Sequence, residues 1–192
     1  MVIRAALVAA VVVAGFGGAT AESDGAFPGA NGRIVFQRGT PYENGPSSLY
    51  LVNANGTGVV RLTNGYQHDA QPSWSPDGTR IAFESTRRGD TDVFSVMPDA
   101  SGLKQLTFSR GFDGDPAWND DGTRIAFETS RNGALDIYAI NSNGEGPMRL
   151  TSSPAEDMDP AWSPGGSMIA FTSTRSGRRQ IWVMDMDGGT QS

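Results

Sequence analysis

Short runs of alternating apolar and polar residues follow one another along this chain, with turn residues between them. The run Arg80–Ser85 places Ile81 and Phe83 on one side of an extended strand and the small Ala82 on the other. A polar turn follows, and the next run extends from Asp92 to Met97. A period of two in such short runs predicts antiparallel strands joined by hairpins rather than helices.

One block of residues returns at a fixed interval. The sequence QPSWSPDGTRIAF at 71–83 reappears as DPAWNDDGTRIAF at 115–127 and as DPAWSPGGSMIAF at 159–171. The spacing is 44 residues, as the block's Trp74, Trp118 and Trp162 show. Two further sets of positions keep it: Leu62-Thr63, Leu106-Thr107 and Leu150-Thr151; and Tyr50, Phe94, Tyr138 and Trp182. The chain is therefore a repeat array.

Each repeat divides into four short strands. In the second copy they are the segment ending at Trp74, then 80–85, 92–97 and 104–108, with a Ser-Pro-Asp-Gly turn after the first. Four strands in a repeat of this length predict an all-β fold of propeller blades. A solenoid of β-coils is the alternative fold, although it is typically built from shorter repeats.

The repeat register also predicts the blade boundaries. We expect a short N-terminal segment at 22–31, a partial blade at 32–66, complete blades at 67–110 and 111–154, and a partial blade at 155–192. The first partial blade lacks its first strand and the last lacks its fourth. Such an array predicts an open arc, a small ring or half of a larger assembly, and an open arc would favour a homo-oligomer that closes the ring.

The first 21 residues have the pattern of a cleavable signal peptide. Arg4 supplies a positive charge, 5–18 form an apolar run, and Ala19-Thr20-Ala21 resembles a cleavage site. The run is short and glycine-rich for a membrane span, so an uncleaved anchor is the less favoured alternative. We therefore expect a periplasmic or secreted protein with no stable membrane span after cleavage.

Composition excludes several classes of function. The formal net charge is −6, which argues against a nucleic-acid partner, and the 192 residues include no cysteine and one histidine. Disulfides and thiolate metal sites are thus excluded. There is no Gly-x-Ser-x-Gly nucleophile motif and no phosphate-binding glycine loop, so the sequence predicts that the protein is not an enzyme.

The repeat has a family likeness. The pattern Leu-Thr, then Pro-x-Trp-Ser-Pro-Asp-Gly-x-x-Ile-Ala-Phe, then Ile-Tyr, closely resembles the blade repeat of TolB-type propellers over about 31–188. The same repeat is found in propeller domains of prolyl-oligopeptidase-like peptidases. The resemblance to TolB implies an exported, non-enzymatic propeller of the cell envelope that binds a protein partner. The resemblance to the peptidases leaves open a propeller that lacks its hydrolase domain.

Acidic residues recur where each blade enters its first strand. Asp69, Asp113 and Asp157 occupy one repeat position, and Gln71, Asp115 and Asp159 occupy the position two residues later. First strands line the centre of a propeller, so these side chains should gather at one channel mouth. We assign Asp69, Asp113 and Asp157 as candidate ligands of a cation such as Ca²⁺, and Asp115 and Asp159 as candidate partner contacts. The alternative is that each Asp caps its own loop.

Two further predictions concern single side chains. His68, beside Asp69, is a candidate partner contact, although a solvated loop histidine is the simpler interpretation. Arg87 and Arg131 should pair with Asp92 and Asp136 across their hairpins. The favoured function is a non-catalytic scaffold for a protein or peptide partner, and the alternatives are a peptidase propeller and a cation- or small-ligand-binding protein.

Overall fold

The computed structural model describes residues 32–39, 45–64 and 66–192. These residues form β-strands joined by turns, as the alternating pattern predicted. The strands, in chain order, are β1 (Arg33–Gly39), β2 (Ser47–Asn53), β3 (Val60–Arg61), β4 (Asp69–Trp74), β5 (Ile81–Ser85), β6 (Asp92–Val96), β7 (Lys104–Gln105), β8 (Asp113–Trp118), β9 (Arg124–Asn132), β10 (Ala134–Asn141), β11 (Met148–Arg149), β12 (Asp157–Trp162), β13 (Met168–Ser173) and β14 (Gln180–Asp185).

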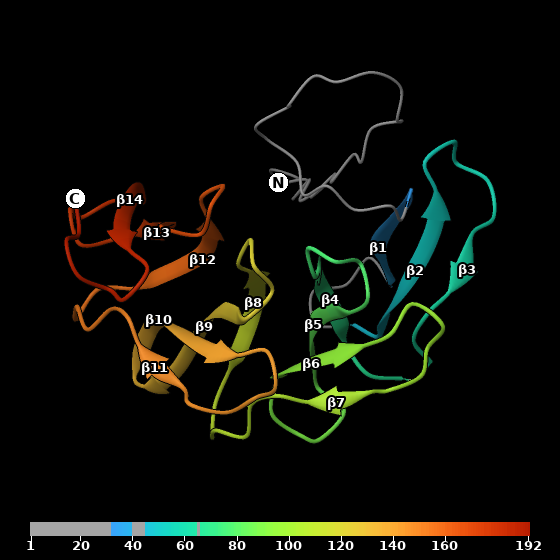
Figure 1. Cartoon of the computed structure of the whole chain (residues 1–192). Helices are drawn as coiled ribbons and strands as arrows, with labels where there is room; N and C mark the ends of the chain where they lie inside the picture. Colours follow the sequence, from blue (N-terminus) through green and yellow to red (C-terminus); the bar gives the residue numbers. More distant parts are fainter. Residues whose placement is uncertain (1–31, 40–44, 65) are drawn as a thin grey trace, which may run out of the picture.

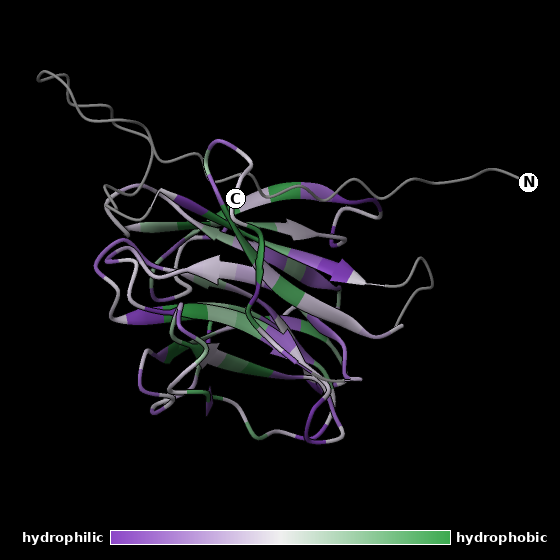
Figure 2. Ribbon diagram, turned by 90° about the vertical axis from the view of Figure 1, so that its right-hand side faces the viewer, coloured by the Kyte–Doolittle hydropathy of each residue, from purple (hydrophilic) through white to green (hydrophobic). Residues whose placement is uncertain are grey.

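The strands make four antiparallel sheets, each a run of consecutive strands. Blade 1 is β1-β2-β3, blade 2 is β4-β5-β6-β7, blade 3 is β8-β9-β10-β11 and blade 4 is β12-β13-β14. The blades follow one another around an arc, with the first strand of blades 2, 3 and 4 on the inner side and β3, β7 and β11 on the outer side (Figure 1). Seen from the side, the sheets stack as successive layers (Figure 2). The predicted all-β, partial propeller is confirmed.

Each blade has two chemically different faces. The leading face, toward the preceding blade, carries large side chains such as Trp118, Ile125 and Phe127 in blade 3. The trailing face, toward the next blade, carries smaller ones such as Ala82 and Val93 in blade 2. Small residues let the next sheet approach closely, and the large ones fill the remaining space. The tryptophan series therefore belongs to the packing between blades.

The repeated Leu-Thr pair completes each of the first three blades. The hydroxyl oxygen of Thr107 accepts the amide hydrogen of Val93 at 2.9 Å, and Leu106 is only 1% exposed in the core. Thr63 and Thr151 accept the amides of Leu49 and Ile137 in the same way, at 3.0 and 2.9 Å. This bond helps a strand of only two paired residues to hold the outer edge of a blade. The fourth strand of blade 2, at Lys104–Gln105, is shorter than the predicted run at 104–108.

The predicted signal peptide at 1–21 and the segment at 22–31 lie outside the described residues. In the part of the chain that the structure describes, no helix is long and apolar enough to cross a membrane.

Candidate functional site

The first strands of blades 2, 3 and 4 share a bulge with unusual backbone geometry. Gln71, Asp115 and Asp159 have φ values of 48°, 47° and 53°, in the left-handed region that few non-glycine residues occupy. In blade 3 the strand pairing is interrupted between Gly114 and Ala117. The bulge releases these residues from the regular strand pairing.

Each bulge removes one backbone N–H from the strand pairing, and this N–H donates to a side chain of the preceding blade. The N–H of Asp115 donates to Glu84 Oε2 at 3.3 Å, and the N–H of Asp159 donates to Glu128 Oε2 at 3.0 Å. The N–H of Gln71 donates to Gln37 Oε1 at 2.9 Å. Glu84 and Glu128, both 6% exposed, thus link neighbouring blades at the inner strands.

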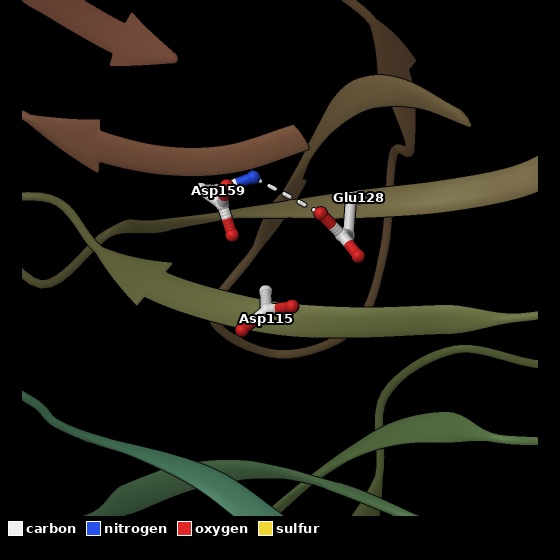
Figure 3. A group of neighbouring side chains, drawn as sticks. All are labelled: Asp115, Glu128 and Asp159. Atoms are coloured by element: carbon white, nitrogen blue, oxygen red, sulfur yellow. Dashed lines mark hydrogen bonds between the residues drawn. The ribbon is translucent and has the colours of Figure 1, made fainter. Parts of the chain in front are cut away.

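Three carboxylates meet where blades 3 and 4 adjoin. Asp115 on β8, Glu128 on β9 and Asp159 on β12 each have an oxygen within 4.8 Å of the other two (Figure 3). We call these three residues the acidic cluster. The side-chain amide of Gln71 donates to Asp115 Oδ1, which extends the cluster toward blade 2. Sequence reasoning placed Asp115 and Asp159 together correctly but missed Glu128.

Burial and mutual repulsion raise the pKa of two members of the acidic cluster, Glu128 and Asp115. Burial, and then the charge of Asp115, raises the pKa of Glu128 to about 8. Burial, and then the charge of Glu84, raises the pKa of Asp115 to about 6. Carboxylates crowded in this way bind a positive charge readily, because the cation relieves both penalties.

The three aspartates expected to hold a cation have another role. Asp69, Asp113 and Asp157 are 0–1% exposed, and each pairs with an arginine of its own blade. The distances between guanidinium nitrogen and carboxylate oxygen are 2.7 Å to Arg87, 3.1 Å to Arg131 and 2.7 Å to Arg175. Carboxylates already paired with a guanidinium are poor cation ligands, so the geometry favours a structural role, although one that consists of an ion pair with arginine and not of the loop cap given as the alternative.

These pairs also correct the predicted pairing across each hairpin. The Arg131 guanidinium lies over the rings of Phe127 and Tyr138, 5.5 and 4.6 Å from their centres, and points back to the first strand. Asp136 instead pairs with Arg149 at 2.7 Å. Asp92 likewise accepts from Gln105 at 2.9 Å and not from Arg87. The third-strand aspartates therefore bond the fourth strand.

His68 lies at the joint between blades 1 and 2. Its Nδ1 is 3.1 Å from Ser47 Oγ and 3.2 Å from the carbonyl oxygen of Gly45, and its Nε2 is 3.5 Å from Glu84 Oε1. The contact with Glu84 raises the pKa of His68. Because Glu84 also binds the amide of Asp115, His68 is connected to the neighbourhood of the acidic cluster without belonging to it.

The acidic cluster brings carboxylate oxygens from β8, β9 and β12 together. Oxygen ligands from three strands suit a hard cation such as Ca²⁺, or the ammonium or guanidinium group of a partner. The signal for the missed Glu128 is visible in the sequence, since an acid follows the second-strand Phe in both complete blades, at Glu84 and Glu128.

Comparisons with known proteins agree with the repeat. The chain matches the family model described as the TolB beta propeller domain twice, at residues 26–113 and 103–192. A curated TolB homolog from Chlorobium luteolum is 44% identical over 50 residues, which cover 26% of this chain and 12% of that protein. The chain thus spans a small part of that relative.

Two solved structures have the same fold. The putative TolB of Agrobacterium tumefaciens superimposes with a TM-score of 0.75 at 26% identity, over 86% of this chain and 61% of that one. TolB of Acinetobacter baumannii gives 0.73 at 24% identity, over 88% of this chain and 42% of that one. Matches to the family model across all described residues show that the chain belongs to the TolB beta-propeller family.

Proposed function

We propose that this chain is an exported, non-catalytic propeller that binds a basic segment of a protein partner at the acidic cluster. The observation that carries the proposal is the meeting of Asp115, Glu128 and Asp159 where blades 3 and 4 adjoin. In the described parts of the chain, no lysine or arginine forms an ion pair with any of the three. A cationic side chain from a partner would supply the missing charge.

Family membership supports partner binding and export. The proteins it resembles are named TolB, and the resemblance drawn from the repeat implies an envelope protein that acts through its propeller. The signal-peptide pattern at 1–21 fits a periplasmic or secreted location.

An arrangement that resembles a catalytic relay, at the joint between blades 1 and 2, supports the non-catalytic part of the proposal. Ser47, His68 and Glu84 lie in the order of a serine, histidine and acid triad. However, the Ser47 hydroxyl donates to the carbonyl oxygen of Asp69 at 2.8 Å, and Ser47 is only 7% exposed. A hydroxyl whose proton is held by a backbone carbonyl is not activated by the imidazole, and a buried oxygen does not meet a substrate.

Cation binding is the second candidate, because the three carboxylates are close enough to share one ion. Ca²⁺ accepts carboxylate oxygens in flexible geometry and would need further ligands from water or a partner. The two candidates use the same residues and differ in what binds.

The test is a calorimetric titration of the protein with a tetralysine peptide and, separately, with Ca²⁺. We expect the peptide to bind, and its affinity to fall about tenfold or more in the double variant Asp115→Asn, Asp159→Asn, since two charge-assisted contacts are lost. Asparagine tolerates the left-handed backbone, so the fold should be kept. Replacing exposed Asp90 by asparagine is the matched control and should leave the affinity unchanged.

The outcomes separate the candidates. Binding of Ca²⁺ alone, lost in the same double variant, would replace partner binding by cation binding. Binding of tetralysine that is equally strong in the wild type and the double variant would contradict the proposed site.

A further inference from the structure

The trailing face of blade 4 differs from the other three trailing faces. Ile181 on β14 is 78% exposed, whereas its equivalents Leu49, Val93 and Ile137 are each 0% exposed beneath the next blade. Blade 4 lies at the end of the arc, with this face turned away from blade 3 (Figure 1). Among the described residues, blade 4 therefore presents an apolar sheet face without a partner.

Strand alternation defines which side chains form this face. Met184 and Trp182 point to blade 3, where Met184 is fully buried, so Ile181 and Val183 point the other way. The neighbouring strand adds Ala170, paired with Val183, and Met168, which is 41% exposed. The face is small and apolar at its centre.

The centre of the face is flanked by opposite charges. Arg179 immediately precedes β14 and Asp185 ends it, and both are exposed and in phase with Ile181 and Val183. The order along the strand is thus positive, apolar, apolar, negative. In the covered blades the equivalent pairs are uncharged: Ser47 and Asn53, Thr91 and Met97, and Leu135 and Asn141.

We propose that this face binds the same face of a second copy of the chain, with the two β14 strands antiparallel about a two-fold axis at Trp182. In that arrangement Arg179 of each copy lies opposite Asp185 of the other, and Ile181 lies opposite Val183. The charge order is self-complementary only when the second strand is reversed, and reversal is what a two-fold axis produces. Charge complementarity therefore identifies a second copy as the occupant.

The experiment is sedimentation velocity on the full chain produced in an exporting bacterial host. We expect a reversible dimer, and we expect Arg179→Glu and Asp185→Arg each to weaken it about tenfold or more, because each variant places like charges opposite one another twice. An equimolar mixture of the two variants should restore the dimer, since the mixed dimer has two pairs of opposite charge. This rescue separates the interface from any loss of folding.

A hydrophobic control completes the design. Ile181→Asp should abolish the dimer, whereas Phe108→Asp, at a side chain that is 75% exposed elsewhere, should leave it intact. A monomer at all concentrations would overturn the proposal. So would a dimer that survives Ile181→Asp, or single charge variants that are not rescued by mixing.

Discussion

Replacing Asp113 by alanine is expected to lower the free energy of unfolding by about 3–5 kcal/mol, because it removes one partner of a buried ion pair. Asp113 is 0% exposed, and the Arg131 side chain, 20% exposed, would be left without its carboxylate. The Ser109 hydroxyl, which donates to Asp113 at 2.7 Å, would also lose its acceptor. Urea unfolding followed by circular dichroism measures the change.

Asp187→Ala is the matched control for that prediction. Asp187 pairs with Arg124 at 3.3 Å, but the Asp187 side chain is 72% exposed. We expect this change to cost less than about 1 kcal/mol, as for most surface ion pairs. Equal costs at the two positions would show that the buried pairs do not stabilise the individual blades. In that case, the assignment of Asp69, Asp113 and Asp157 to structural roles would fail.

The second large effect is a gain in stability. Glu128→Gln is expected to raise the free energy of unfolding at pH 8.5 by about 4 kcal/mol and to change it by less than about 1 kcal/mol at pH 5. Burial and the charge of Asp115 raise the pKa of Glu128 to about 8, so the folded protein holds a proton that the unfolded chain releases near pH 4.5. The contribution of this proton to the free energy of unfolding is fully present below the pKa of Glu128 in the unfolded chain, and it is lost as the pH rises through 8. Glutamine is neutral at every pH and removes this loss.

Unfolding titrations across pH 5 to 9 test the prediction. The same exchange at exposed Glu145 serves as the control and should leave the pH dependence unchanged. If Glu128→Gln destabilises the protein equally at both ends of the range, the carboxylate is held for its hydrogen bond to the amide of Asp159 and not as a strained charge.

The fold was predictable because the same pattern of strands and turns recurs in every repeat. The fixed interval of the tryptophans and of the Leu-Thr pairs gave the blades and their order, and the alternation around Ile81 and Phe83 gave the leading face. Local pattern also placed Asp115 and Asp159 in one neighbourhood, since both lie at the same position of an inner strand.

The composition of the site was less predictable because it depends on two blades meeting. Glu128 is in the second strand, and its contact with the amide of Asp159 spans 31 residues. The bulge that turns Asp115 out of its strand comes from a left-handed backbone at a residue other than glycine, which alternation does not signal. The Arg131 partner was misassigned for a similar reason, since a long side chain lying over two rings can reach a strand that is not its neighbour in the hairpin.

The left-handed backbone at the bulge also limits which side chains these positions accept. Residues branched at Cβ strain this conformation, whereas asparagine, aspartate and glycine accept it readily. In this chain the three positions are occupied by one neutral and two acidic residues, Gln71, Asp115 and Asp159, and none of them is branched at Cβ. An exchange of aspartate for asparagine at one of these positions therefore changes the charge at the inner strands by one unit while the backbone of the blade is kept.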